Sequence, residues 1–168
     1  MIIKISIKFN IFTNSLIQSN MEKLKKNNEE LDRINAEILS HMDNPRNYGE
    51  MENSDGIGKC QNEKTSEFLM VFIKVNNDNI LENITYGCQA NQDSSLSASL
   101  FTEMVKGDTL DNALESLKLM QSHILDVPQA QKMNSGMVLH AFRAAMINRE
   151  NRMNGMDEDV FTIPLEIE

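Results

Sequence analysis

Residues 68–75 read Phe-Leu-Met-Val-Phe-Ile-Lys-Val, and residues 80–86 read Ile-Leu-Glu-Asn-Ile-Thr-Tyr. The first run is apolar on both faces, which is typical of a central strand. In the second run apolar and polar residues alternate over much of the length, as in a half-buried strand. Residues 76–79, Asn-Asn-Asp-Asn, connect the two runs, and Asn and Asp tolerate the positive φ angles of hairpin loops. This stretch therefore predicts an antiparallel β-hairpin.

Helical patterns flank the hairpin on both sides. On the N-terminal side, apolar residues recur at helical spacing from Leu24 to Met42, and Pro45 ends this helix. On the C-terminal side, a helix over residues 94–106 ends at Gly107, and a second helix begins at residues 108–109. A last long helix is predicted over residues 132–149. Residues 150–168 are acidic and contain Pro164, so we expect them to be a C-terminal tail outside the domain.

Residues 1–20 precede the first predicted helix and match no targeting signal. Lys4, Ser6, Lys8 and Asn10 interrupt the apolar run, whereas a secretory signal needs a continuous one. An organellar transit peptide is rich in Arg, which this segment lacks. We expect that Met21 is the natural start, that residues 1–20 are an extra segment, disordered or not native, and that residues 21–149 form the domain.

The composition excludes several classes of protein. The chain has 168 residues, of which 40% are hydrophobic, so it can form one domain with a real core. A formal net charge of -9 argues against binding of duplex nucleic acid, which needs a clustered basic face. No apolar run approaches the roughly 20 residues of a membrane-spanning helix. The two cysteines form neither a disulfide scaffold nor a CxxC pair. We expect an acidic cytoplasmic protein that binds neither nucleic acid nor membranes.

Several short motifs occur in a fixed order along the chain. They are His-Met-Asp-Asn-Pro-Arg-Asn-Tyr-Gly at 41–49, Asp-Gly-Ile-Gly-Lys at 55–59, the strand at 68–75, Tyr-Gly-Cys at 86–88, and Ser-Ala-Ser-Leu-Phe-Thr-Glu-Met-Val-Lys-Gly-Asp-Thr at 97–109. In this order and spacing, from about residue 31 to residue 148, they resemble the iron–sulfur cluster scaffold family of IscU and the NifU N-terminal domain. The resemblance implies an α+β fold, in which long N-terminal and C-terminal helices and shorter ones pack on a three-stranded antiparallel sheet. Its third strand would lie within Met51–Cys60.

The resemblance also implies where ligands should lie. The family uses three cysteines, an aspartate, and a histidine beside the third cysteine. The corresponding residues here are Thr65 for the first cysteine, Glu67 for the aspartate, Cys88 for the second cysteine, and Asn134 and Ser135 for the histidine–cysteine pair. Iron in clusters is held by soft, anionic thiolates. Cys88 and Glu67 are therefore the candidate ligands of an iron–sulfur cluster or iron, Ser135 is a further metal-ligand position, and the ligand set is incomplete.

Two further features bear on this site. Aligning Cys60 with the family's first cysteine would restore one thiolate, but it requires a shift of five residues. Alternatively, Cys60 is a small, half-buried residue near the end of a strand. In addition, the segment that follows Cys88 is about three residues longer than in the family, and residues 91–93 are the insertion.

Three functions are compatible with these residues. The first is a scaffold or carrier in iron–sulfur cluster assembly, which holds a cluster or iron between two subunits through Cys88 and Glu67. The second is a cluster-free adaptor that binds the assembly machinery. The third is a sulfur acceptor that carries a persulfide on Cys88. By resemblance, the partners are a cysteine desulfurase, cluster-acceptor proteins and a second copy of the chain. We expect a protein that is not an enzyme.

Overall fold

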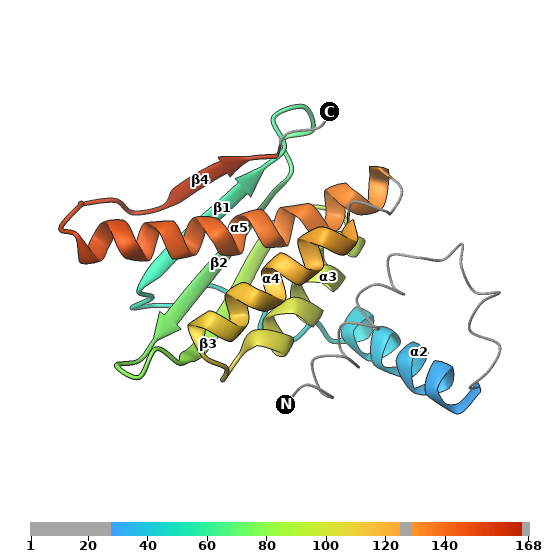
Figure 1. The fold of residues 1–168 in the computed structure, drawn as a ribbon. Helices are drawn as coiled ribbons and strands as arrows, with labels where there is room; N and C mark the ends of the chain where they lie inside the picture. Colours follow the sequence, from blue (N-terminus) through green and yellow to red (C-terminus); the bar gives the residue numbers. More distant parts are fainter. Residues whose placement is uncertain (1–27, 125–128, 166–168) are drawn as a thin grey trace.

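The computed structural model describes residues 28–124 and 129–165. The expectations about residues 1–20 and about a start at Met21 lie outside the described residues. The elements are α2 (Asn28–Asp43), β1 (Gly56–Gln61), β2 (Phe68–Val75), β3 (Leu81–Gln89), α3 (Gln92–Val105), α4 (Leu110–Ile124), α5 (Gln129–Met153) and β4 (Phe161–Pro164). The described residues thus form an α+β fold (Figure 1).

The sheet is built around the predicted hairpin. Its strand order is β3-β2-β1-β4, and both β1–β2 and β2–β3 are antiparallel. β2 pairs with β3 from the Phe68–Gln89 pair to the Val75–Leu81 pair, which confirms the hairpin. β1 overlaps the segment in which the third strand was expected.

The expectation of three antiparallel strands is wrong, because a fourth strand makes the sheet mixed. β4 pairs parallel to β1, from Gly58–Phe161 to Gln61–Pro164. The N–H of Leu165 then donates to the carbonyl of Gln61, and Leu165 is buried. Proline lacks a donor and is tolerated on an edge strand, where one side needs no partner. The segment interpreted as an acidic tail therefore contributes to the fold.

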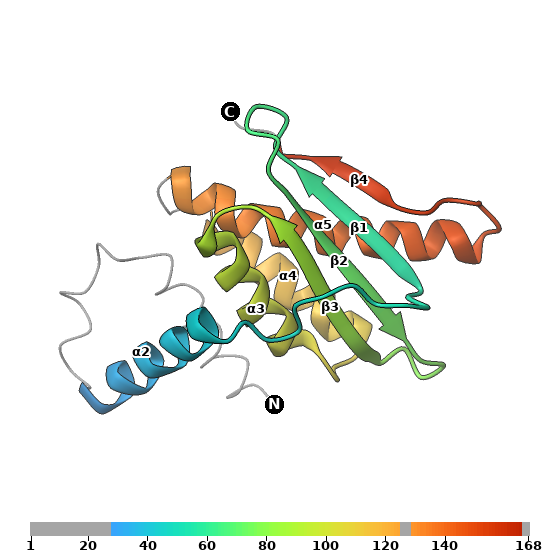
Figure 2. The ribbon, with the colours of Figure 1, turned by 180° about the vertical axis from the view of Figure 1, so that it is seen from behind.

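Helices α3, α4 and α5 cover one face of the sheet (Figure 1), and the connection from α2 to β1 crosses the other face (Figure 2). α5 lies closest to β1, and glycines make this approach feasible. A Cβ atom on Gly56 would lie 2.2 Å from the carbonyl oxygen of Ala145, and one on Gly58 would lie 2.0 Å from the Ala145 nitrogen. These glycines fix the position of α5, which carries Asn134 and Ser135.

α2 docks on α3 through its apolar face, and Ile34 on this face is buried. The helix ends at Asp43, just before Pro45, and α3 is followed by Gly107 with a φ of 81°, as the sequence predicted. α5 is longer than expected and runs to Met153. None of the helices in the described ranges is both long and apolar enough to cross a bilayer.

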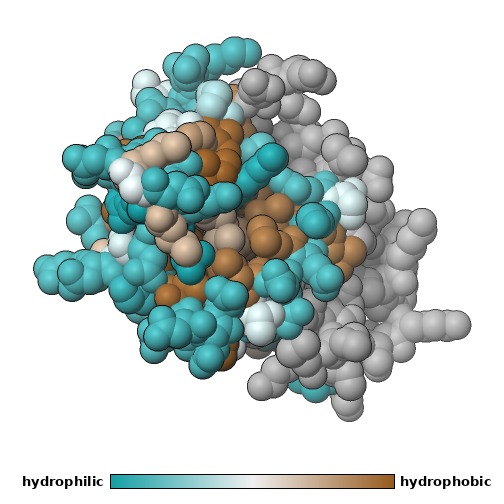
Figure 3. All heavy atoms as spheres, turned by 60° about the vertical axis from the view of Figure 1, so that its left-hand side comes forward, coloured by the Kyte–Doolittle hydropathy of each residue, from teal (hydrophilic) through white to brown (hydrophobic). Residues whose placement is uncertain are grey.

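Some large apolar side chains remain on the surface. On the face shown in Figure 3, hydrophobic residues gather near the centre and hydrophilic residues surround them. The exposed large hydrophobic residues of the described ranges are Leu39, Tyr48, Leu119, Met153, Met156 and Val160. Single apolar side chains at the surface are ordinary in folded proteins.

Candidate functional site

Cys88 lies near the end of β3 and pairs with Leu69 of β2. It is half-buried on the face covered by the helices, because Tyr86, two positions earlier on the same face, reaches Ser95 of α3. Burial raises the pKa of the Cys88 thiol, and the hydrogen bonds that it makes with the Ser95 side chain and the Ala90 backbone lower the pKa by less. The thiol is therefore protonated at neutral pH, and a bound cation must displace this proton.

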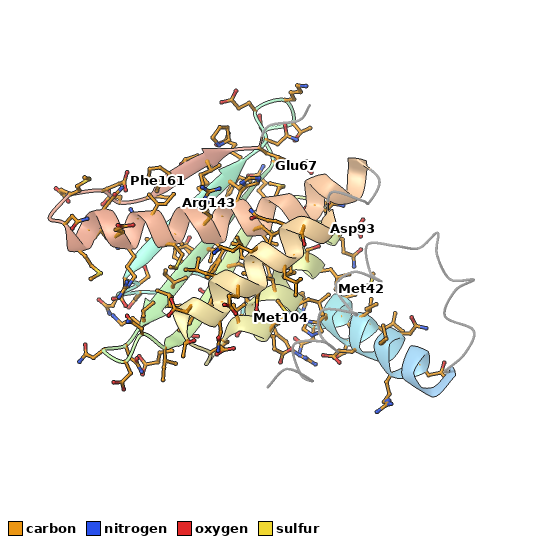
Figure 4. All side chains as sticks on the ribbon, in the orientation of Figure 1. Met42, Glu67, Asp93, Met104, Arg143 and Phe161 are labelled. Atoms are coloured by element: carbon orange, nitrogen blue, oxygen red, sulfur yellow. The ribbon has the colours of Figure 1, made fainter. Side chains whose placement is uncertain are left out.

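Glu67 directly precedes β2 and lies at the same end of the sheet as Cys88. Because Leu69 pairs with Cys88, Glu67 and Cys88 are diagonal neighbours, whose Cα atoms are about 7–8 Å apart. Figure 4 shows Glu67 at the end of the sheet where β1 and β2 are connected. Its carboxylate accepts a hydrogen bond of 2.9 Å from the hydroxyl of Thr65. The structure thus brings the two principal candidate ligands to one end of the β2–β3 pair.

Asn134 connects α5 to the beginning of α3. Its Oδ1 accepts hydrogen bonds from Asn91 Nδ2 at 2.9 Å and from Ser94 Oγ at 3.3 Å, and its Nδ2 lies 3.5 Å from Asp93 Oδ2. Figure 4 shows Asp93 beside the start of α3. We call these four residues the Asn134 network. Asn91 also caps α3 by accepting from the Ser94 N–H.

The Asn134 network includes two of the three inserted residues, and the sequence analysis did not assign them a role. The signal was present in the sequence, because Asn directly before a helical pattern is a preferred N-cap residue. The rotation of α5 that turns Asn134 toward this N-terminus cannot be seen in the sequence.

Ser135 is fully buried, and its hydroxyl has no hydrogen-bond partner within the described residues. Successive residues of a helix point about 100° apart, so Asn134 and Ser135 face different directions. Asn134, rather than Ser135, contacts the start of α3, and this start follows Cys88 by only a few residues in the chain.

Cys60 lies near the end of the inner strand β1 and is fully buried. It pairs with Leu69 from one side, and Cys88 pairs with Leu69 from the other side. The two cysteines are therefore two strands apart, at a Cα–Cα distance of about 10 Å. Two thiolates that bind the same ion each lie about 2.3 Å from it. Cys60 and Cys88 are too far apart for this, so the fold does not bring them together at one ion. Burial raises the pKa of Cys60 to about 12.

Comparison with known families locates this site within a shared domain. A family model described as "NifU-like N terminal domain" matches residues 33–155, which is most of the chain and includes Glu67, Cys88 and Asn134. The chain belongs to the NifU-like N-terminal domain family. The resemblance drawn from the motifs is therefore confirmed.

Curated relatives support the same placement. This NifU-like chain is 33% identical over 135 residues to the iron-sulfur cluster assembly scaffold protein IscU 1 of Archaeoglobus fulgidus, with 78% of this chain and 85% of the relative covered. It is 31% identical over 121 residues to the iron-sulfur cluster assembly scaffold protein IscU of Escherichia coli strain K12, with 68% and 92% covered.

A solved structure shares the fold of this NifU-like domain. It is the crystal structure of a putative iron-sulfur cluster assembly scaffold protein for the SUF system from Fervidobacterium islandicum AW-1. The TM-score is 0.54, the sequence identity is 14%, and 67% of this chain and 93% of the other are covered.

The described residues of this NifU-like domain place two anionic donors at this end of the sheet. Clusters are usually held by four ligands, most often thiolates. Within the described residues of one chain, Cys88 supplies one thiolate and Glu67 one carboxylate at this end of the sheet. The amide of Asn134 is a neutral oxygen donor that is already hydrogen-bonded. Of the groups described here, the thiolate and the carboxylate are therefore the candidate anionic ligands.

A second group of metal-ligating side chains lies where α2 meets α3. The ligand atoms of Glu37, His41 and Glu103 all lie within 4.8 Å of one another. The guanidinium of Arg46 contacts His41 Nε2 at 2.9 Å and also contacts Glu103, while His41 Nδ1 is 2.7 Å from Ser99 Oγ. Arg46 supplies the positive charge inside this group, which therefore joins α2 to α3 as an ionic contact.

An open pocket of about 470 Å³ lies at the opposite end of the β2–β3 pair. Lys74, Glu82 and Lys106 are among its lining residues, and Lys74 forms an ion pair of 2.7 Å with Asp55. Because Lys74 pairs with Asn83, at the end of the hairpin away from Cys88, this pocket is separate from the candidate site.

Proposed function

We propose that this NifU-like domain is a scaffold or carrier in iron–sulfur cluster assembly that binds a cluster or iron through Cys88 and Glu67. The observation that carries the proposal is the position of these two side chains at one end of the β2–β3 pair. A thiolate and a carboxylate together suit iron, which accepts both kinds of ligand. The relatives named as scaffold proteins support the same role.

Two copies of the chain would complete the site. Cys88 and Glu67 from each of two subunits amount to four anionic ligands, which is the number that clusters usually take. Each chain has a formal net charge of -9, so two copies repel each other until cations are bound between them. We therefore expect iron to promote the dimer. The cluster or iron is cargo, and the protein is not an enzyme in this role.

The proposed partners are a cysteine desulfurase, which supplies sulfur, and proteins that accept the finished cluster. We propose that this exchange occurs in the cytoplasm. A partial ligand set suits exchange, because fewer protein–metal bonds must break when the cargo leaves.

Anaerobic reconstitution tests the proposal. The wild-type protein is incubated with Fe²⁺, sulfide and a cysteine desulfurase, and the visible absorbance and the iron content are measured. We expect absorbance that is lost in Cys88→Ser and weakened in Glu67→Gln, with a dimer in native mass spectrometry. Cys60→Ser is the matched control and should retain the absorbance. A band that survives Cys88→Ser would show that the ligand is wrong.

The cluster-free adaptor is the second candidate, and one observation favours it. The polar donors near Cys88 are satisfied within the chain, since Thr65 binds Glu67 and the amide of Asn134 binds α3. Absence of any band, together with desulfurase binding that is unchanged by Cys88→Ser, would favour this role. The raised pKa of Cys88 opposes sulfur acceptance, because the thiolate is the nucleophile in that reaction.

A further inference from the structure

A group of metal-ligating side chains that contains no thiol lies where the C-terminal end of α2 meets α3 (Figure 1, Figure 2). The imidazole of His41 on α2 faces the carboxylates of Glu37, one turn earlier, and of Glu103 on α3. His41 is fully buried, whereas each of the two glutamate side chains is 30% exposed. Solvent and ions can therefore reach the group from the carboxylate side. We call these three residues the His41 group.

The spacing of the ligand atoms in the His41 group is close to the spacing around one metal ion. His41 Nε2 lies 3.0 Å from Glu103 Oε2 and 3.9 Å from Glu37 Oε1, and the three ligand atoms all lie within 4.8 Å of one another. Nitrogen and oxygen ligands lie about 2.0–2.2 Å from a zinc ion, so two of them on one ion are about 3.0–3.5 Å apart. His41 and Glu103 have this spacing, and the partly exposed Glu37 needs to move by about 1 Å.

The protein supplies its own cation to the His41 group in the metal-free state. Nη1 of Arg46 lies 2.9 Å from His41 Nε2 and also contacts the carboxylate of Glu103. Arginine only donates hydrogen bonds, so the lone pair of Nε2 points at Nη1, and the proton of the neutral ring is on Nδ1. This is the tautomer that binds a metal ion through Nε2. The position of Nη1 therefore marks the point on which the imidazole and the Glu103 carboxylate converge.

Ser99 on α3 orients the imidazole of His41. His41 Nδ1 lies 2.7 Å from Ser99 Oγ, and the backbone N–H of Arg46 donates to the same oxygen at 2.7 Å. A hydroxyl oxygen has two lone pairs, so Ser99 can accept both protons. Histidines that bind metals almost always donate their second ring N–H to a partner outside the ligand set. The imidazole is thus oriented as it would be in a metal site.

The charges of the His41 group suit a divalent cation better than one arginine. Glu37 and Glu103 carry two negative charges, of which Arg46 balances one, whereas a divalent ion balances both. The Arg46 side chain is 37% exposed, and its Nη2 donates to the hydroxyl of Ser40 at 3.1 Å in an exposed hydrogen bond. The guanidinium can therefore move into solvent without repacking of the core.

We propose that the His41 group is a metal site that binds a divalent transition-metal ion, such as Zn²⁺, through one imidazole nitrogen and two carboxylate oxygens, and that the ion replaces the guanidinium of Arg46. Imidazole and carboxylate are both common ligands of zinc. The bound ion takes over the contact between α2 and α3 that Arg46 makes in the metal-free protein. This site is independent of the proposed function, because it includes neither Cys88 nor Glu67.

Calorimetric titration with Zn²⁺ tests the site in Cys88→Ser, which has lost the thiol of the candidate cluster site. We expect one Zn²⁺ per chain, counted by native mass spectrometry. In this background Glu37→Gln and Glu103→Gln should each weaken binding by about 10-fold or more, since even groups that only orient a ligand contribute 10–100-fold. Arg46→Gln should tighten binding several-fold, because it removes the competing positive charge. Glu115→Gln, which changes an exposed carboxylate on α4, is the matched control and should leave binding unchanged.

The outcomes separate a metal site from an ion pair that only joins two helices. Weaker binding in both Glu→Gln variants together with tighter binding in Arg46→Gln supports the proposal. If Cys88→Ser binds no Zn²⁺, or if Glu37→Gln and Glu103→Gln bind it as well as their parent, the metal site is overturned. If Arg46→Gln binds Zn²⁺ no more tightly than its parent, the replacement of the guanidinium is overturned.

Nuclear magnetic resonance identifies the ligand atom and covers the case in which Arg46→Gln does not fold. The ring ¹⁵N resonances of His41 are recorded in Cys88→Ser before and after addition of Zn²⁺. We expect the Nε2 resonance to shift while Nδ1 keeps its proton, because Nδ1 donates to Ser99. An unshifted Nε2 resonance at saturating Zn²⁺ would show that His41 is not a ligand and would overturn the proposal.

Discussion

Gly58→Ala should strongly destabilise this domain, because β1 and α5 leave no room for a side chain. A Cβ atom at Gly58 would lie 2.0 Å from the nitrogen of Ala145 and 2.1 Å from the carbonyl oxygen of Ala141. Ordinary contacts begin at 3.4 Å, so α5 would have to move by about 1.4 Å. Adding a methyl group to a packed core costs about 1–3 kcal/mol, and backbone atoms cannot rotate away as side chains do. We therefore expect a loss of about 3 kcal/mol.

The loss is measurable by thermal and urea unfolding, followed by circular dichroism. For a domain of this size, about 3 kcal/mol lowers Tm by about 6–12 °C. The urea midpoint should fall while the m value stays constant. Gly87→Ala is the matched control, because no atom lies within 4 Å of the added Cβ, and its stability should change by less than about 0.5 kcal/mol. If Gly58→Ala were as stable as the wild type, α5 could not lie this close to β1.

Three further predictions concern the site and the pH dependence. Asn134→Ala should lower the unfolding free energy by about 1–3 kcal/mol, because the buried Ser94 hydroxyl loses the Asn134 oxygen to which it donates. Urea unfolding measures the change, and an unchanged urea midpoint would contradict the prediction. Iodoacetamide should alkylate Cys88 slowly and Cys60 not at all in the native state, because Cys88 is half-buried whereas Cys60 is fully buried and its pKa is raised to about 12. Mass spectrometry should find one adduct, and two after unfolding in urea. Although burial raises the pKa of Asp55, hydrogen bonds from a lysine and the backbone outweigh this effect, so its folded-state pKa lies below the ordinary value. The ionised Asp55 carboxylate therefore stabilises the folded state fully above about pH 4, and this contribution disappears as the pH falls through the folded-state pKa. The free energy of unfolding should consequently decrease less in Asp55→Asn than in the wild type between pH 6 and pH 3.

Local rules were sufficient to predict most of the fold. The hairpin follows from two apolar runs and an Asn-rich loop, and the helix ends follow from Pro45 and Gly107. These signals act over a few residues, so the sequence contains them directly. The motifs then identified the family and the region of the third strand.

β4 was missed because its strand signal is short and depends on a distant partner. Four residues with alternating burial and a final Pro164 do not distinguish an edge strand from a tail. What makes this segment a strand is the free edge of β1, about a hundred residues earlier in the chain. The turn after α5 returns the chain to that edge, where Glu158 accepts hydrogen bonds from Asn148 and Asn151.

The candidate site was predictable in part. The position of Cys88 at the end of a hairpin strand follows from the local pattern, and its proximity to Glu67 follows from the pairing register. The separation of Cys60 from Cys88 depends on strand order, which a single sequence does not state. The partners of Asn134 depend on the rotation of α5, which the contact of Gly58 with that helix sets.

Three contacts that lie outside the ligand set build the surroundings of Cys88. The register of β2 and β3 pairs Cys88 with Leu69, and the cap of α3 holds the first turn to which Tyr86 bonds. The close approach of α5 to β1 brings Asn134 to the start of α3. Each contact has its own physical cause, namely strand pairing, helix capping and the absence of a side chain at Gly58. A substitution at any one of them changes these surroundings without altering a ligand. Stability and iron binding should consequently fall together in variants of the β1–α5 contact.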